Sequence, residues 1–268
     1  MYKITNHPIL DIPDAEVVEF LFEGKPVQGR KGYTIAKALH EAGYPVHSHS
    51  LKDRNRSLEC GIGKCGACEM LVDGKVRRIC ITPVDGVKEV RIIAHEADLP
   101  GVTFDAPVKE EAAKDLTIYK TTVAIIGAGP AGLACREQLQ KFGIDCLVID
   151  NNARIGGQFN MQTHQFFFFE KEKKYGGMRG FDIAKTLAGE SQEGILLNYT
   201  VWDLLEGPRI AIKNIVTSEM AYVDAQHLVV ATGAVPFMPA FENDDVPGVY
   251  TAAVFQKMMN QDRTAGIT

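Results

Sequence analysis

The sequence has no apolar run long enough to cross a membrane. Its longest aromatic run, residues 166–169, is far shorter than the roughly 20 residues that a membrane-spanning helix needs. Residues 1–8 contain no apolar stretch after a basic one, so they do not resemble a secretion signal. These absences predict a chain without a transmembrane segment and with a cytoplasmic location.

The sequence also lacks an excess of basic residues. It contains 29 lysines and arginines against 34 acidic residues, which gives a net charge of −5 and a pI near 5.8. A nucleic-acid partner requires a concentrated basic patch, so we expect no nucleic-acid binding. The 268 residues, 46% of them hydrophobic, suffice for about two domains of roughly 100–200 residues, each with its own core.

Cysteines are few, but most of them are gathered in one short stretch. In a chain without a secretion signal, clustered cysteines interleaved with glycines indicate metal binding rather than disulfides. The spacing fits the C-x4-C-x2-C…C pattern of a plant-type [2Fe–2S] cluster, whose iron prefers soft thiolate ligands. The predicted ligands are Cys60, Cys65, Cys68 and Cys80.

Two other kinds of cysteine site fit less well. A zinc ribbon usually pairs two C-x2-C knuckles, and only one is present here. A redox dithiol formed by Cys65 and Cys68 would leave Cys60 and Cys80 without a role. The pattern therefore favours an iron–sulfur cluster.

The remaining histidines and cysteines near these motifs are expected to be structural. His47 and His49 precede the cysteine loop, but four thiolates already complete a cluster, so we expect packing or surface roles for them. Cys135 and Cys146 have no partner nearby in the sequence, and we expect them to be small core residues.

The residues around the cysteine loop predict a small α+β domain. Strand-like alternation predicts a hairpin over 17–29, and apolar spacing predicts a helix over 34–42 that ends at Gly43. Asp73 and Gly74 form a tight-turn signal that would bring Cys80 back beside the loop. With a last strand at 87–93, this unit resembles the β-grasp ferredoxin domain, within a first domain that we place at 1–95.

A linker is predicted at 96–118, followed by a second domain at 119–268 that opens with a βαβ unit. An apolar strand at 120–126 leads into a G-x-G-x-x-G turn, a helix and a second strand that ends in an acidic residue. In this context the glycines admit a pyrophosphate at the helix N-terminus, and the acidic residue accepts from ribose hydroxyls. The predicted nucleotide contacts are Gly127, Gly129, Pro130, Ala131, Gly132 and Asp150.

The fingerprint alone leaves FAD and NAD open. Two later sequence segments favour FAD, because they resemble the second and third sequence elements of the flavoprotein family with two dinucleotide-binding domains. These pieces contribute Gly157 and Gln158 in a loop, and Thr232 and Gly233 after a late apolar strand.

A cysteine loop followed by Gly-Ala-Gly-Pro-Ala-Gly-Leu resembles the family of sarcosine oxidase alpha, opine oxidase A, hydrogen cyanide synthase and dye-linked proline or hydroxyproline dehydrogenases. The resemblance implies that the four cysteines hold the cluster and that the predicted nucleotide contacts hold FAD. It also implies an oxidoreductase subunit that passes electrons between FAD and the cluster during oxidation of an amino or imino acid. Partner subunits and a small-molecule substrate are implied as well, and no catalytic acid or base is assigned.

The sequence departs from this family in one respect. No second G-x-G-x-x-G follows a strand after residue 133, so the Rossmann-like FAD-binding domain is predicted to be incomplete. Two alternative functions therefore stay open. One is a non-catalytic electron-transfer or docking module of a larger complex, and the other is an NAD(P)H-linked flavin reductase.

Overall fold

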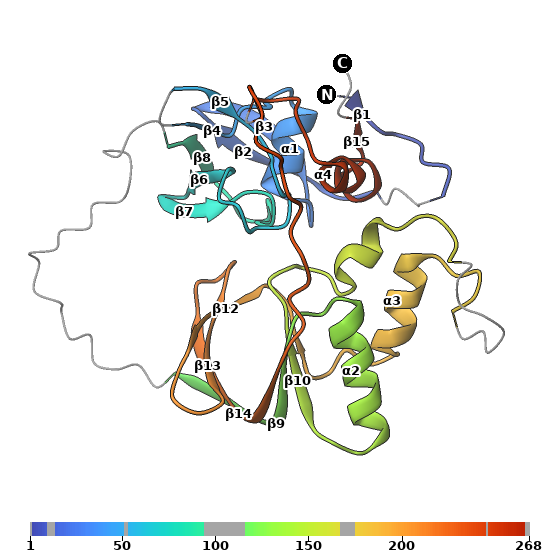
Figure 1. Ribbon diagram of the computed structural model, residues 1–268. Helices are drawn as coiled ribbons and strands as arrows, with labels where there is room; N and C mark the ends of the chain where they lie inside the picture. Colours follow the sequence, from blue (N-terminus) through green and yellow to red (C-terminus); the bar gives the residue numbers. More distant parts are fainter. Residues whose placement is uncertain are drawn as a thin grey trace, which may run out of the picture. The chain divides into compact units, whose positions relative to one another are not determined.

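The computed structural model describes residues 2–9, 14–50, 53–93, 116–166, 175–244 and 246–265. Its contacts divide the chain into two compact units (Figure 1). Unit 1 comprises Met1–Ala106 together with Val235–Thr268, and unit 2 comprises Pro107–Ala234. The predicted second domain, 119–268, differs from unit 2 because its last part groups with unit 1. Most of the predicted linker at 96–118, and most of the phenylalanine run, lie outside the described residues.

Unit 1 contains a five-stranded mixed sheet in the order β3-β2-β8-β6-β7. Strand β2 pairs in parallel with β8, and the other three pairings are antiparallel. The predicted hairpins are confirmed, and Asp73 and Gly74 take the positive φ angles of 48° and 74° that a tight turn requires. The strands are β2 (Val17–Phe22), β3 (Lys25–Arg30), β6 (Glu69–Val72), β7 (Lys75–Arg78) and β8 (Glu89–Ile92).

Helix α1 (Ile35–Glu41) packs its apolar face into the core of unit 1. Thr34 caps the helix, because its Oγ1 accepts from the amide of Lys37 at 3.3 Å. This agrees with the helix predicted over 34–42. Shorter strands complete unit 1, and they are β1 (Tyr2–Lys3) paired with β15 (Thr264–Ala265), and β4 (Ser48–His49) paired with β5 (Asn55–Arg56).

The C-terminal segment supplies part of the core of unit 1. It forms helix α4 (Ala252–Lys257), which continues into the π-helical turn η3 (Met258–Asp262). Val254 and Met258 have no exposed surface and pack in the same cluster as Cys68 and Cys80. A segment far along the chain therefore completes the cysteine-containing unit.

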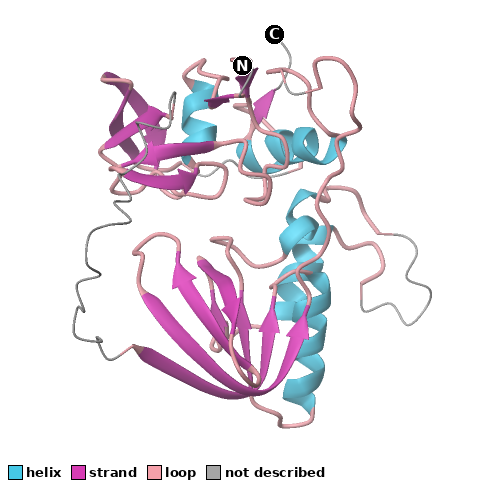
Figure 2. Ribbon diagram, turned by 60° about the vertical axis from the view of Figure 1, so that its left-hand side comes forward, coloured by secondary structure: helices cyan, strands magenta, loops and turns pink. Residues whose placement is uncertain are grey.

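Unit 2 is built on a six-stranded sheet in the order β11-β10-β9-β14-β13-β12. Figure 2 shows its strands side by side in magenta. The first four strands are parallel, and β13 and β12 continue the sheet in antiparallel pairings. The late apolar strand predicted before Thr232 is the end of a longer strand, β14. The strands are β9 (Thr117–Ile126), β10 (Cys146–Ile149), β11 (Ile195–Leu196), β12 (Tyr199–Leu204), β13 (Arg209–Asn214) and β14 (Met220–Val230).

Helices α2 (Pro130–Lys141) and α3 (Gly180–Ala188) cover one face of this sheet. Leu133 and Ile183 pack with Ile125 in one cluster, whereas a second cluster of buried residues lies on the other side of the strands. This is the predicted Rossmann-like arrangement. No helix in the described parts of the chain is both long and apolar enough to cross a membrane.

Arg136 joins α2 to the turn after α3 and is only 2% exposed. Its guanidinium donates to the carbonyl oxygens of Ala188, Ser191 and Glu193 at 2.8, 3.1 and 2.9 Å. We expect Arg136→Leu to lower the free energy of unfolding by about 3 kcal/mol, because hydrogen bonds from a charged donor contribute roughly 1.5–3 kcal/mol each and three carbonyl oxygens lose a buried donor. Chemical denaturation measures this loss. The exposed Lys185→Ala is the control, and an equally small effect of both changes, within about 0.5 kcal/mol, would contradict the assignment.

Candidate functional site

The cysteine loop brings the four predicted thiols together as two pairs. The thiols of Cys60 and Cys65 are hydrogen-bonded neighbours, and so are those of Cys68 and Cys80. Cys65 is exposed and the other three are buried. In the described residues, no three His, Cys, Asp or Glu side chains converge on one ion position. Two thiol pairs match a two-iron cluster better than a single tetrahedral zinc ion.

Backbone amides of the loop point at the sulfur atoms. The Sγ of Cys60 accepts from Ile62, Lys64 and Cys65 at 3.5, 3.4 and 3.4 Å. The Sγ of Cys80 accepts from Gly63 at 3.2 Å. Such amides stabilise negative charge on cluster sulfurs, so the residues present fit an iron–sulfur cluster.

These contacts also set the protonation of the thiols. The hydrogen bond from the Cys65 thiol, aided by the backbone amides, lowers the pKa of Cys60 to about 5. The same pairing and burial raise the pKa of Cys65. The hydrogen bond with Cys68, together with burial, raises the pKa of Cys80. The loop therefore favours the ionised form of Cys60, which is the form of cysteine that binds metal.

Arg78 contacts the cysteine loop, although no motif in the sequence singled it out. Its guanidinium donates to the carbonyl oxygen of Gly63 at 2.8 Å and to Glu69 at 3.0 Å. A β-carbon on Gly63, whose φ is +73°, would lie 2.5 Å from the side chain of Ile81, so only glycine fits here. Arg78 and Ile81 therefore both restrict the shape of the cysteine loop.

The other histidines and cysteines take structural places. His47 is fully buried and stacks on His40, with 4.7 Å between ring centroids. His49 is half-buried, and its Nδ1 lies 3.9 Å from Asp53. Cys135 and Cys146 pack beside the core of unit 2.

In unit 2, the predicted nucleotide contacts meet at the carboxyl ends of β9, β10 and β14. A β-carbon on Gly132 would lie 1.9 Å from the carbonyl oxygen of Gly127, and one on Gly127 would lie 2.3 Å from that of Ala231. Gly129, in contrast, faces open space. The first amides of α2 lack helical partners, and together with the open face of Gly129 they leave room for a phosphate.

Asp150 ties the glycine turn to the end of β10. Its Oδ2 accepts from the amide of Ala128 at 2.7 Å, and its Oδ1 accepts from the amide and side chain of Asn152 at 2.7 and 2.8 Å. A carboxylate has about four lone-pair sites, so acceptor capacity is left for a ribose hydroxyl. Asn152, which fixes the carboxylate, was missed in the sequence because Asn is common in loops after strands.

The two later pieces that favoured FAD also reach this turn. Gly157 opens the short helix η2 (Gly157–Met161), and a β-carbon there would lie 3.1 Å from the Cα of Gly129. Gln158 Nε2 donates to the carbonyl oxygen of Ala234 at 3.3 Å. Thr232 and Gly233 are exposed just after β14. Pieces separated by more than half of unit 2 in sequence thus form one rim around the glycine turn.

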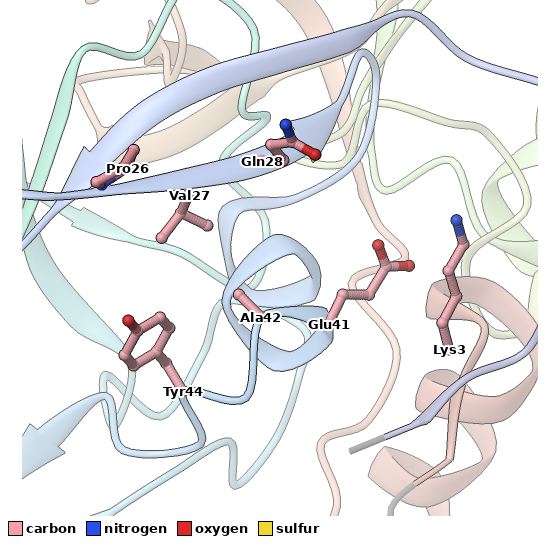
Figure 3. Close-up of a pocket in the computed structure, with 7 residues that line it drawn as sticks. All are labelled: Lys3, Pro26, Val27, Gln28, Glu41, Ala42 and Tyr44. Carbon is pink, nitrogen blue, oxygen red and sulfur yellow. The ribbon is translucent and has the colours of Figure 1, made fainter.

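A hollow of about 430 Å³ lies on unit 1 (Figure 3). Pro26, Val27 and Gln28 of β3 form one side, and Glu41, Ala42 and Tyr44 form the other, with Lys3 nearby. None of the predicted site residues lines it, so the candidate chemistry belongs to the cysteine loop and the glycine turn.

Family models match both parts of the chain. A 2Fe-2S iron-sulfur cluster binding domain matches residues 15–92, and the pyridine nucleotide-disulphide oxidoreductase model matches residues 121–265. The predicted pair of cofactors, a [2Fe–2S] cluster and FAD, is confirmed at the level of domain type.

Similar proteins span more than this chain does. Sarcosine oxidase subunit alpha of Corynebacterium sp. (strain P-1) is 24% identical across 94% of this chain and 27% of its own length. Isoquinoline 1-oxidoreductase subunit alpha of Brevundimonas diminuta is 35% identical across 26% of this chain and 43% of its own length. Both are subunits by name.

A solved structure supports the fold over nearly the whole chain. L-proline dehydrogenase from P. horikoshii has a TM-score of 0.73 and 22% identity, and the match covers 97% of this chain and 49% of that one. The predicted order of a ferredoxin-like unit and a Rossmann-like unit is thereby confirmed. The chain belongs to the pyridine nucleotide-disulphide oxidoreductase family and carries a 2Fe-2S iron-sulfur cluster binding domain ahead of the part that defines that family.

Proposed function

We propose that this protein is an iron–sulfur flavoprotein subunit that passes electrons between FAD and a [2Fe–2S] cluster while an amino or imino acid is oxidised. The observation that carries this proposal is the presence, in one chain, of two thiol pairs cradled by amides and of a glycine turn fixed by Asp150. The names of sarcosine oxidase subunit alpha and L-proline dehydrogenase support the substrate class. Flavin exchanges electrons in pairs and the cluster one at a time, so together they link a two-electron donor to a one-electron acceptor.

The residues take distinct roles in this proposal. Cys60 and Cys65 hold one iron, and Cys68 and Cys80 hold the other, since these are the pairs that lie together. The glycine turn receives the pyrophosphate of FAD, and Asp150 accepts from its ribose. The contacts assigned to FAD are Gly127, Gly129, Pro130, Ala131, Gly132, Asp150, Gly157, Gln158, Thr232 and Gly233.

We further propose that the protein works with partner subunits in the cytoplasm. Two relatives are named as alpha subunits, which supports a hetero-oligomer. All six cysteines of this chain are free, as expected in a reducing compartment.

Anaerobic titration tests the substrate class. We expect the flavin absorbance of the purified protein, supplied with its partner subunits, to bleach on addition of L-proline, hydroxyproline or sarcosine, because oxidation of the amino acid delivers two electrons to the flavin. D-glucose is the negative control. Bleaching by NADH or NADPH, with none by any amino acid, would contradict the proposal and favour a flavin reductase.

A non-catalytic electron-transfer or docking module is the second candidate. The chain spans 27% of sarcosine oxidase subunit alpha and 49% of the proline dehydrogenase chain, so these residues contain only part of what those proteins use. This alternative predicts that the purified chain holds iron and sulfide but has no turnover with any amino acid. Counting iron and flavin per chain separates the two functions.

A further inference from the structure

One buried lysine is not explained by either cofactor motif. Lys257 ends α4, and its side chain is 10% exposed, as is that of Asp262 in the π-helical turn that follows. The ammonium donates to both carboxylate oxygens, at 2.8 and 3.0 Å. Burying a charged pair costs several kcal/mol per ion, and apolar side chains could fill the same space without that cost. The π-helical turn is a second unusual feature, because such turns often occur at functional sites.

The side chain of Lys257 runs over the cysteine loop. A β-carbon on Gly61, the residue after Cys60, would lie 3.1 Å from the Cδ of Lys257. On the same helical segment, Val254 and Met258 are fully buried in the cluster that contains Cys68 and Cys80. The segment therefore holds Lys257 against the loop.

Lys257 holds its charge beside the cysteine loop, because its stem lies against Gly61 and its ammonium pairs with the buried Asp262. Burial opposes the charge of the lysine itself, but attraction to Asp262 and the hydrogen bonds between them raise its pKa overall. The lysine is therefore cationic at neutral pH.

Other titratable groups near this pair do not cancel its effect. Burial and then the charge of Lys257 lower the pKa of His40 to about 3, so this histidine is neutral. Burial lowers the pKa of Lys37 to about 8, although Glu41 and then Asp262 oppose this shift. Arg78 also reaches the loop, at the carbonyl oxygen of Gly63, but it pairs with Glu69 and both side chains are far more exposed than those of Lys257 and Asp262. Lys257 and Asp262 are thus the buried charged pair beside the loop.

We propose that Lys257 is a positioning residue for electron transfer, a fixed buried cation that raises the reduction potential of the cluster. Reduction adds one electron to an already anionic cluster and breaks no bond, so a nearby positive charge stabilises the reduced form. Asp262 holds the ammonium in place and limits the size of this effect. The inference rests on the ligand assignment of the proposed function. In that function, the flavin donates the electron that reduces the cluster.

The test is a redox titration of the holoprotein with dithionite and mediators, followed by the visible absorbance of the cluster. We expect Lys257→Met to lower the potential and Asp262→Asn to raise it, because one change removes the cation and the other removes its counter-ion. Each shift is expected to change the ratio of reduced to oxidised cluster by roughly tenfold at fixed potential, which is about 59 mV for one electron. Lys257→Arg keeps the charge and is expected to stay near the wild-type value.

Two further variants keep the test decisive. Lys37→Met removes a buried ammonium that pairs with Glu41 instead, and it is the matched control. The double variant Lys257→Met with Asp262→Asn leaves no unpaired charge, and its potential is expected to lie between those of the two single variants. If Lys257→Met does not fold with a cluster, the rise in Asp262→Asn still decides the question.

The outcomes separate this inference from the proposed function. Shifts in the same direction for both single variants, or shifts no larger than that of Lys37→Met, would overturn the role of Lys257 and leave the ligand assignment intact. A wild-type protein that assembles no cluster would instead overturn the proposed function itself. Because no amino acid is added, failure of the substrate proposal does not affect the result.

Discussion

Replacing Cys80 by serine is expected to remove nearly all of the [2Fe–2S] cluster. Cys80 is 1% exposed, and its Sγ pairs with Cys68 and accepts from the amide of Gly63. A serine hydroxyl is a harder ligand that stays protonated at neutral pH, so it cannot replace the thiolate. Since loss of even a supporting group costs about 10–100-fold in metal affinity, we expect at least that loss here. Iron and acid-labile sulfide per chain, with the visible spectrum, measure it.

Unit 2 supplies the matched control for this change. Cys135→Ser and Cys146→Ser remove thiols that pack beside the core of unit 2, and both are expected to leave the iron content unchanged. Equal iron in Cys80→Ser and in these controls would show that Cys80 is not a ligand. Loss of iron in all three variants would point to general instability.

Gly132→Ala is expected to abolish FAD binding and to destabilise unit 2. The added β-carbon would lie 1.9 Å from the carbonyl oxygen of Gly127 and 3.3 Å from Ile125. The first contact is with backbone and cannot be relieved by a rotamer change, so the turn must open, at a cost of about 3 kcal/mol or more, the upper end of the usual overpacking range. Flavin per chain and the midpoint of thermal unfolding measure the two effects.

Gly129→Ala separates flavin binding from stability. Its β-carbon would meet nothing within 4 Å in the protein itself, and its φ needs no glycine, so the fold is expected to tolerate it. The methyl group would, however, occupy the side from which the pyrophosphate approaches. We therefore expect a stable protein with little flavin, and normal flavin content in Gly129→Ala would disprove the placement of the pyrophosphate.

Features set by local chemistry were predictable from the sequence. The turn at Asp73 and Gly74 requires positive φ angles, which these residue types favour, so both the hairpin and the return of Cys80 followed from a few neighbouring residues. The βαβ unit was equally predictable, because the turn between its first strand and its helix has room only for glycine at certain positions, and the G-x-G-x-x-G spacing marks those positions.

Features that depend on distant contacts were not predictable. Nothing in the residues around Lys257 indicates that it meets a loop near residue 61, and Arg136 looks like an ordinary surface residue of a helix until its three carbonyl partners are seen. The grouping of Val235–Thr268 with unit 1 was not predictable for the same reason. Apolar residues at 254 and 258 predict a buried helix face, but they do not say which core buries it.

The division of the chain has a consequence for protein synthesis. Unit 2 interrupts unit 1 in the sequence, and the late residues Val254 and Met258 fill part of the core beside Cys68 and Cys80. A ribosome makes roughly 5–20 residues per second, so the cysteines emerge many seconds before the segment that covers them. During that interval the nascent thiols are without their final cover, and assembly of the iron–sulfur cluster must either wait until residues 254–258 have left the ribosome or proceed on a partly built domain.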